Sequence, residues 1–264
     1  MRNELLKSIS FDEYRKIKAV NQTLIKEVLE NPYYFANDLE KPKKESTALD
    51  FGSLLHDCIL TPNELGAKYL FADVEKVDAR TKEGKALKEQ AASDGKILVD
   101  GALANLAWQI IEQNQPILDA LIDREHGVCE ATITGELYGF DCKARLDYFS
   151  SSKEILDLKF VQSSKPNDFA KTAANFGYHI QAAFYQMLAG TDSFTFLAIE
   201  KEAPFMVGIY ELDSVAIDLG KEKIKKAFEI MLNKKHYMQN IWKNEADLEC
   251  TRQVLSLPAF AFYE

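Results

Sequence analysis

Residues 128–160 show the pattern that most constrains the fold, because apolar and polar side chains alternate there in three successive segments. The segments are 128–134, 138–149 and 154–160, with breaks at 135–136 (Gly-Glu) and 150–153 (Ser-Ser-Ser-Lys). Successive side chains of a β-strand point to opposite faces of the sheet, so each segment predicts a strand. Because the breaks are as short as hairpin turns, the pattern predicts three antiparallel strands that follow one another.

Helical spacing of apolar residues surrounds these strands. Before them, we expect helices over 23–30, 48–60, 80–96 and 98–122, so the first 125 residues are mainly helical. After them, we expect a helix over 166–190, strands over 194–200 and 205–212, and a long helix over 214–240. This order predicts one α/β (α+β) domain over residues 1–264, with a central mixed sheet in 126–264 flanked by helices.

The cysteines and the charge narrow the class of protein. The four cysteines lie far apart without a CxxC pair, which argues against a zinc ribbon, a disulfide framework or an iron–sulfur cluster. Residues 1–20 are too charged for a signal peptide, and no apolar run approaches the roughly 20 residues of a membrane helix. We therefore expect a cytoplasmic protein without membrane contact. The net charge of −9 counts only weakly against a nucleic-acid partner, since local charge can outweigh the total.

Charged side chains gather on one face of each predicted strand. The alternation groups Asp141, Lys143, Arg145 and Asp147 in the second strand, Asp157 and Lys159 in the third, and Glu130 in the first. For any one of them, a solvated strand face is the simpler explanation. Asp157 differs because it lies inside the apolar run 155–160, where a carboxylate is costly unless a cation or donors meet it. The pattern predicts a cleft lined by Glu130, Asp147 and Asp157.

Asp147, Asp157 and Lys159 are the residues that predict a chemical function. Mg²⁺ is typically bound by one or two carboxylates together with water and substrate phosphate, and the two aspartates supply that number. Lys159 follows Asp157 on the same strand face. An ammonium group there would orient an attacking water and offset charge on a scissile phosphate.

Several motifs in the right order then carry a family resemblance. Residues 142–147 (CKARLD) and 155–159 (ILDLK) resemble the core of the PD-(D/E)XK nuclease superfamily, with Leu146 where the motif has its proline. Residues 51–56 (FGSLLH) resemble the histidine-bearing helix of RecB-like nucleases, and 177–185 (GYHIQAAFY) resemble their Gln and Tyr helix. Residues 31–34 (NPYY) and 194–204 (FTFLAIEKEAP) resemble the RecE, or exonuclease VIII, branch. The resemblance implies the restriction-endonuclease-like fold.

The resemblance also implies roles for individual residues. Asp147 and Asp157 would bind metal, assisted by the backbone carbonyl of Leu158, with His56 as a further ligand and Lys159 as the catalytic lysine. Imidazole suits Mn²⁺ better than Mg²⁺, so either ion is expected to support activity. Outside this family, His56 would be read as a core residue. Gln181 and Tyr185 are four residues apart on one helix face, so they are expected to reach the same cleft.

Other charged residues leave alternatives open. Glu130 would bind metal or water, or form a salt bridge with Lys143 or Arg145. Lys143 and Arg145 would contact DNA phosphates, or neutralise the acidic cluster. The basic stretches 41–44, 82–88 and 221–226 are either a DNA track or solvated helix faces.

The function implied by the resemblance is degradation of linear double-stranded DNA from a 5′ end. RecE-like enzymes are processive, form ring-shaped homo-oligomers such as tetramers, and work with a RecT-like single-strand annealing protein in phage-type recombination. Within catalysis, the alternative is another RecB-like nuclease that acts on single strands. Outside it, the alternatives are a noncatalytic DNA-end-binding protein on the same scaffold, and a small-molecule- or protein-binding module.

Overall fold

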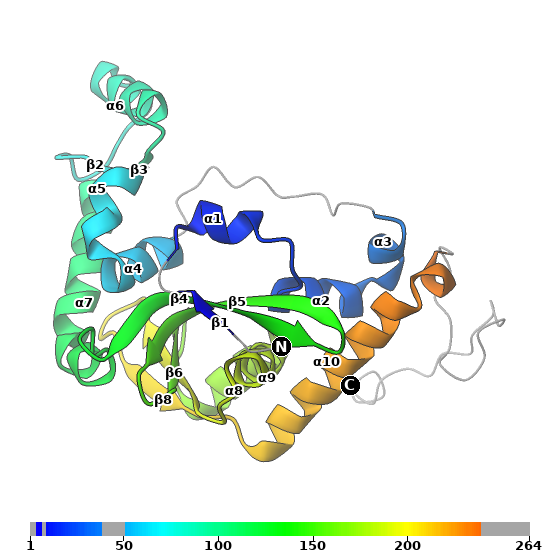
Figure 1. Cartoon of the computed structure of the whole chain (residues 1–264). Helices are drawn as coiled ribbons and strands as arrows, with labels where there is room; N and C mark the ends of the chain where they lie inside the picture. The colour runs from blue at the N-terminus through cyan, green and yellow to red at the C-terminus, as the bar shows by residue number, and fades with distance from the viewer. Residues whose placement is uncertain (1–3, 7–8, 39–50, 239–264) are drawn as a thin grey trace, which may run out of the picture.

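The computed structural model describes residues 4–6, 9–38 and 51–238 (Figure 1). The basic stretch 41–44, the first residues of the helix expected over 48–60, and the last two of the helix expected over 214–240 lie outside these ranges. Within the described ranges, no helix combines the length and the apolar character that crossing a bilayer requires.

A six-stranded sheet forms the centre of the molecule, in the order β1-β4-β5-β6-β7-β8. Its strands are β1 (Glu4–Leu6), β4 (Gly127–Leu137), β5 (Phe140–Ser150), β6 (Ile155–Val161), β7 (Phe194–Glu200) and β8 (Val207–Tyr210). Neighbouring strands are antiparallel except β6 and β7, which run parallel. The predicted mixed sheet and the three consecutive antiparallel strands are therefore confirmed.

The turn between β4 and β5 is not where the sequence predicted it. Gly135 and Glu136 lie within β4 and pair with Cys142 and Asp141. The chain reverses instead at Tyr138 and Gly139, whose φ angles are 53° and 81°. Two residues with positive φ between paired strands form the turn that matches strand twist, and glycine adopts this conformation at little cost. The prediction at 135–136 was wrong because that glycine sits in extended backbone.

Strands β5 and β6 separate soon after they pair. Their ladder holds only two pairs, Tyr148 with Leu156 and Phe149 with Ile155. The β4–β5 ladder runs from Gly127 to Leu137 and is broken at Glu130, whose φ is 54°. The next positions along the diverging strands are Asp147 on β5 and Asp157 on β6, so two carboxylates stand at the fork.

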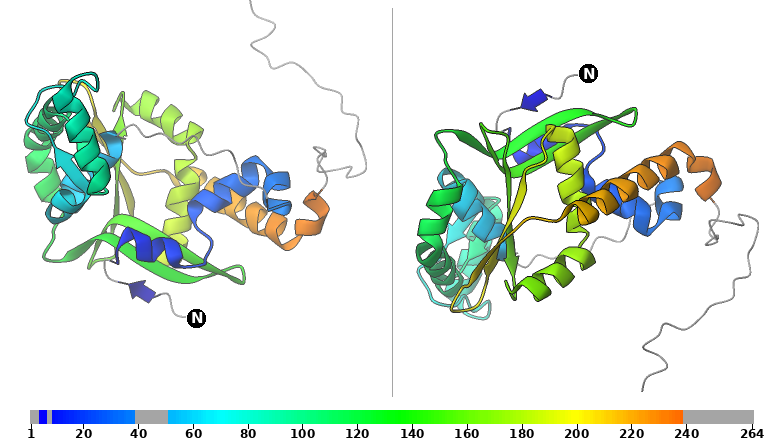
Figure 2. Two further views of the ribbon diagram at one scale, coloured as in Figure 1. Left: turned by 90° about the horizontal axis from the view of Figure 1, so that it is seen from above. Right: turned by 90° about the horizontal axis from the view of Figure 1, so that it is seen from below.

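Both faces of the sheet are covered by helices. Helices α2 (Gln22–Glu30), α9 (Tyr178–Ala189) and α10 (Ser214–Leu232) pack on one face. Helices α4 (Phe51–Leu60) and α7 (Gly101–Leu121) pack on the other, as the views of Figure 2 show.

Strand β6 shows how the two faces are divided. Its odd-numbered residues Ile155 and Val161 join the first core, whereas Leu156 and Leu158 join the second. The sequence predicted one charged face at a cleft; instead, Asp157 and Lys159 lie on a face that α9 covers.

The remaining elements are short, and several were not predicted. They are α1 (Phe11–Lys16), α3 (Pro32–Ala36), η1 (Pro62–Glu64), α5 (Leu65–Lys68), α6 (Lys82–Ser93), α8 (Pro166–Asn175), η2 (Lys234–Tyr237), and the parallel pair β2 (Tyr69–Phe71) and β3 (Ile97–Val99). Strands β2 and β3 and helix α6 form an arm that projects from the body (Figure 1). Among its described residues, the largely helical N-terminal part therefore also contains three short strands, β1, β2 and β3.

The helix expected over 166–190 is two helices. Gly177 has a φ of 62°, which a continuous helix does not allow, and α9 starts only at Tyr178. A Cβ at position 177 would also meet Lys26 Cε at 3.3 Å. The break sets the direction of α9, which carries both Gln181 and Tyr185.

Candidate active site

Asp147 stands at the fork between β5 and β6, where it takes over a hydrogen bond of the sheet. Its Oδ2 accepts a hydrogen bond of 2.7 Å from the backbone N–H of Leu158. His56 reaches the same atom from α4, with Nδ1 3.5 Å from Asp147 Oδ2. The His56 ring in turn packs edge-on against Phe160 of β6, at 5.1 Å between centroids. Residues from three elements thus meet at one carboxylate.

Asp157 is the most buried charge of the group, with 2% of its side chain exposed. Gln181 Nε2 donates to its Oδ1 at 2.5 Å. Its Oδ2 contacts the Lys159 ammonium in an ion pair, but has no hydrogen bond of good geometry within the described part of the chain. Lys159 Nζ also lies over the Tyr178 ring, 4.8 Å from its centroid. Asp157 therefore accepts a hydrogen bond on Oδ1, whereas its Oδ2 has only the ion pair with Lys159.

The charges of this cluster do not balance, and the pKa shifts of its members show how. Burial, and then the charge of Asp157, raise the pKa of Asp147 well above its ordinary value. Burial tends to lower the pKa of Lys159, but the attraction of Asp157 and Asp147 outweighs it, so the pKa is raised. Burial lowers the pKa of His56, which favours the neutral imidazole. Two carboxylates thus share one ammonium group, and one of them favours its proton.

Tyr185 joins the group through Gln181. It is 7% exposed, lies one helical turn beyond Gln181, and the two side chains are hydrogen bonded. Burial raises the pKa of Tyr185 well above its ordinary value, so the phenol stays protonated. The structure therefore brings His56, Asp147, Asp157, Lys159, Gln181 and Tyr185 into one cluster.

Comparison with known proteins places the chain in a family. Residues 22–246 match the sequence model of a family described as a PDDEXK-like domain of unknown function. The chain belongs to this family. The match confirms the PD-(D/E)XK assignment and the restriction-endonuclease-like fold predicted from the motifs.

Solved structures add support for the fold. A protein from Eubacterium rectale named "Putative exonuclease" is 17% identical, with a TM-score of 0.61, and the match covers 95% of this chain and 96% of that one. A second structure, SSO0001, is 15% identical with a TM-score of 0.29, covering 78% and 84% of the two chains. At these identities the first likeness shows the fold alone, and the second carries no argument. No curated protein sequence matches the chain.

In this PDDEXK-like domain, Glu130 lies beside the cluster, close enough for its charge to contribute to the raised pKa of Asp147. Lys143 and Arg145 lie further along β5 and bind the N-terminal segment. Arg145 forms an ion pair with Glu130 and donates from Nη1 to the carbonyl of Ile9 at 3.0 Å. Of the alternatives for Glu130, the salt bridge with Arg145 is present. Lys143 is 6% exposed. Its ammonium group donates to the carbonyls of Tyr14 and Ile17, at 2.9 and 2.7 Å. Both cations hold the N-terminal segment against the sheet, which leaves Lys143 buried from any DNA phosphate.

Lys26 on α2 is a residue near the site that the sequence analysis did not find. Its Nζ donates to the carbonyl of Phe176 at 2.9 Å, at the turn that precedes α9. Burial, and then repulsion from Lys159, lower its pKa to about 8. A lysine in an amphipathic helix looks like a solvated residue in sequence, and only the packing of α2 on α9 brings it here.

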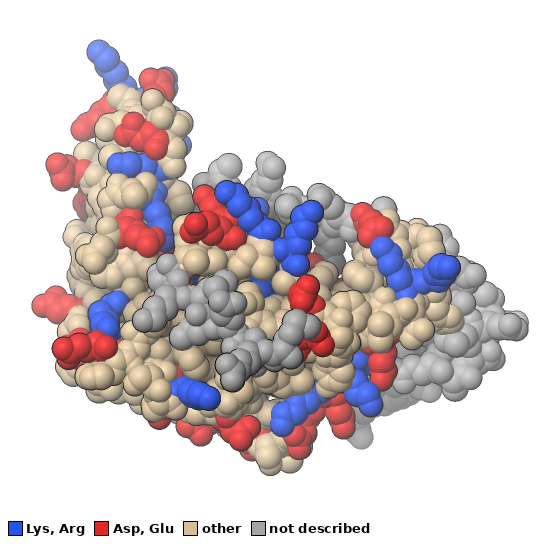
Figure 3. Space-filling model, viewed as in Figure 1, with Lys and Arg blue, Asp and Glu red and all other residues tan. Residues whose placement is uncertain are grey.

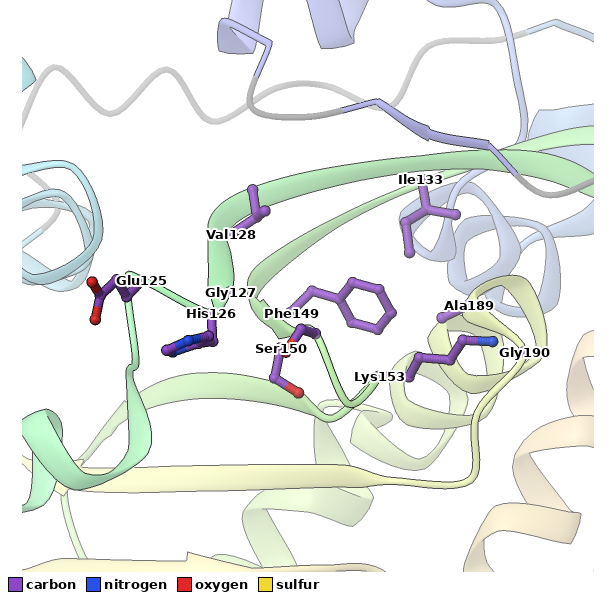
Figure 4. A pocket seen from close by; sticks show the side chains of 11 residues that line it. Glu125, His126, Gly127, Val128, Ile133, Phe149, Ser150, Lys153, Ala189 and Gly190 are labelled. Carbon is purple, nitrogen blue, oxygen red and sulfur yellow. The ribbon is translucent and has the colours of Figure 1, made fainter.

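The other predicted basic stretches lie on two different helices, of which α10 packs on the sheet through buried residues such as Ile224. Residues 82–88 belong to α6 of the projecting arm, and 221–226 to α10. Figure 3 shows Lys and Arg interspersed with Asp and Glu over the visible face, without a single basic band. A pocket of about 730 Å³ lies elsewhere, between the start of β4 and the end of α9 (Figure 4), and none of the predicted site residues lines it.

The donor chemistry of the cluster fits a divalent cation. Within residues 4–6, 9–38 and 51–238, no three His, Cys, Asp or Glu side chains are already arranged around a common metal position. The cluster nevertheless offers two carboxylates, a neutral imidazole and the Leu158 carbonyl, which are ligands that Mg²⁺ and Mn²⁺ accept. The incompletely bonded Asp157 Oδ2 and the raised pKa of Asp147 both indicate missing positive charge.

Proposed function

We propose that this PDDEXK-like domain is a divalent-metal-dependent exodeoxyribonuclease whose centre is Asp147, Asp157 and Lys159. One observation carries the proposal: the two aspartates stand side by side at the β5–β6 fork, largely buried, with a single lysine against one of them. A structural salt bridge needs one carboxylate for one ammonium group. The second carboxylate leaves the cluster short of one positive charge, which a bound cation would supply.

The reaction is hydrolysis of a phosphodiester. Water adds its oxygen to phosphorus, the bond to the leaving oxygen breaks, and that oxygen takes a proton, which leaves a phosphate monoester and a hydroxyl group. A Mg²⁺ or Mn²⁺ ion held by Asp147, Asp157, His56 and the Leu158 carbonyl would supply Lewis-acid polarisation of the phosphate and a more acidic water.

The side chains of the cluster divide the remaining tasks. The Lys159 ammonium group offsets the charge that builds on the phosphate oxygens in the transition state. Gln181 holds Oδ1 of Asp157 and so fixes which oxygen faces the cation. His56 stays neutral through its lowered pKa, which keeps a nitrogen lone pair available. Tyr185 holds Gln181 in place from the next turn of α9.

The finer features of the proposal rest on the RecE resemblance. They are linear double-stranded DNA as substrate, degradation from the 5′ end, a homo-oligomeric ring, and a RecT-like annealing protein as partner. The name of the Eubacterium rectale protein supports exonuclease activity in particular. The motifs of residues 31–34 and 194–204 support the RecE branch over other RecB-like nucleases.

The test is digestion of linear duplex DNA with Mg²⁺ or Mn²⁺, with closed circular DNA alongside. We expect ion-dependent loss of the linear DNA, survival of the circle, and a loss of about 100-fold or more in Lys159→Ala and Asp157→Ala. Lys171→Ala and Asp168→Ala are the matched controls, because that ion pair is on the surface, with side chains 77% and 48% exposed.

Two further arms of the same assay separate the alternatives. Duplexes labelled at the 5′ or the 3′ end report polarity, and a single-stranded substrate distinguishes the RecB-like alternative. If Lys159→Ala and Asp157→Ala digest as fast as the controls, the site is wrong. If the parent binds DNA ends but never cuts, the protein is an end-binding protein on a nuclease scaffold.

A further inference from the structure

A second concave site lies next to the proposed active centre. It is a pocket of about 400 Å³ between α1, the start of α2, β5 and α9. Tyr185 lines it and is hydrogen bonded to Gln181, which binds Asp157. The pocket and the catalytic cluster are thus separated by one turn of α9.

The lining of this pocket combines cations with aromatic rings. Arg15, Lys143 and Arg145 line it, and no Asp or Glu is part of the lining. Phe11 is 55% exposed, with the guanidinium groups of Arg15 and Arg145 lying 5.9 and 5.6 Å from its ring centroid. An exposed ring beside guanidinium groups is the surface on which unpaired nucleic-acid bases stack while phosphates are neutralised.

Hydrogen bonds from two cationic side chains of β5 hold the pocket in shape. Lys143 is only 6% exposed, and its ammonium group donates to the carbonyls of Tyr14, in α1, and Ile17, which directly follows α1. Arg145 binds the carbonyl of Ile9, just before α1. These three bonds fix the segment that carries Phe11 and Arg15 before any ligand arrives.

One residue of the pocket lining also has an unused acceptor. Gln22 lines the pocket, and its Oε1 is buried without a hydrogen-bond partner among the residues that the structure describes. A buried acceptor without a donor is unfavourable, and the exocyclic amino group of a base would satisfy it. Residues 21–23 thus add polar atoms to a pocket otherwise made of rings and cations.

We propose that this pocket binds one unpaired terminal nucleotide of the DNA substrate, with the base stacked on Phe11 and a phosphate against Arg15. The inference rests on the proposed function, because it places the nucleotide next to the one that is cut. The volume lies in the range of about 300–1,000 Å³ that holds a single small molecule. The proposal requires the end of the duplex to open so that a single base can enter.

The experiment measures stacking directly with a fluorescent base. The probe is a linear duplex with one frayed end that carries 2-aminopurine as the terminal base, at the 5′ end in one version and the 3′ end in another. Phosphorothioate linkages protect it from cleavage in the presence of Mg²⁺. We expect the protein to quench the fluorescence at one of the two ends, with binding about ten-fold weaker in Phe11→Leu and in Arg15→Gln.

Matched controls separate stacking from a general loss of structure. Phe71→Leu changes an aromatic residue of the projecting arm that is 36% exposed, and Arg80→Gln changes an arginine with a 91% exposed side chain. Both are expected to bind and quench like the parent. Phe11→Trp keeps a ring at the position and is expected to restore quenching, which an unfolded variant would not do.

The outcomes distinguish this inference from the proposed function. If neither probe is quenched, or if Phe11→Leu and Arg15→Gln quench like the two controls, the pocket does not hold a nucleotide, whatever the digestion assay shows. If quenching follows the expected pattern while the parent fails to digest DNA, the nucleotide site stands and the catalytic proposal falls.

Discussion

Strand β5 carries two groups of buried charges that are built in opposite ways. Around Lys143 and Arg145, every charge is matched within the protein: one cation binds two backbone carbonyls, and the other binds Glu130 and a third carbonyl. Further along the strand, at the β5–β6 fork, Asp147 and Asp157 stand together, and the ammonium group in direct contact with them is that of Lys159. The first group is complete as it stands, whereas the second lacks positive charge.

This difference teaches how to tell a structural charge cluster from a functional one. Burial and charge are alike in both groups, so neither property identifies a site. The two groups differ in whether every charge and every hydrogen-bonding atom has a partner within the protein. The predictions below test that distinction in order of decreasing effect.

The largest effect on stability is expected when Lys159 is removed from the incomplete group, which is Asp147, Asp157 and Lys159. Lys159→Met leaves Asp157 buried without its cation, which should lower the free energy of unfolding by about 3 kcal/mol. Adding Asp157→Asn to this variant should recover most of the loss, because the uncompensated charge is gone. Urea unfolding of both single variants and the double variant measures this coupling. Additive effects would show that Lys159 and Asp157 do not depend on each other.

The complete group should respond to a similar change with a smaller loss. Lys143→Met removes two hydrogen bonds from an ammonium group and leaves the carbonyls of Tyr14 and Ile17 unpaired. We expect the free energy of unfolding to fall by about 2 kcal/mol. Lys171→Met, at a 77% exposed lysine, is the control and should change little. Replacing a nearby carboxylate by its amide should not restore the lost stability, since Lys143 has no carboxylate partner that its removal would leave unpaired.

A divalent ion should stabilise only the incomplete group. With Mn²⁺ at ten times its dissociation constant, the parent should gain about 1.4 kcal/mol by mass action. Thermal unfolding with and without chelator measures the gain, and Asp147→Asn and Asp157→Asn should lose it. Lys143→Met should keep it. An equal gain in the aspartate variants would place the ion elsewhere.

The smallest effect concerns the pH dependence of the metal-free protein. The folded state raises the pKa of Asp147 above its unfolded value of about 3.9, so folding favours the protonated form. This contribution is fully present below that pH and is lost as the pH rises through the folded pKa. Asn cannot ionise and still accepts from Leu158, so Asp147→Asn should have a higher Tm than the parent at pH 7 and an equal Tm at pH 3. Asp141→Asn, on the exposed end of the same strand, should show no such difference.

The sequence allowed the strands and the residues of the candidate site to be placed because both depend on local spacing. Alternation alone sorted Asp157 and Lys159 onto one side of β6 and Leu156 and Leu158 onto the other. Helical spacing placed Gln181 and Tyr185 on one face of α9. Motif order then connected His56 to Asp147 across a large separation in the chain.

The sequence could not predict features that depend on which residues pack over a surface. Alternation assigned Lys143 to a polar face, but the bonds that bury it come from residues 126 and 129 positions away. The expected helix 166–190 ignored the left-handed Gly177, since isolated glycines also occur inside helices. Strands β2 and β3 have three residues each, too few for a period to be recognised.

The fork between β5 and β6 makes the proposed active centre depend on correct strand pairing. Because Asp147 takes the place of a backbone partner for Leu158, the position of the carboxylate and the register of the strands are a single property. A slip by one residue would bring Leu146 or Tyr148 opposite Asp157 and leave no pair of acids. Under the proposed function, a chain that mispairs these strands would therefore lack the two carboxylates needed to hold an ion, and would be inactive until the register is correct.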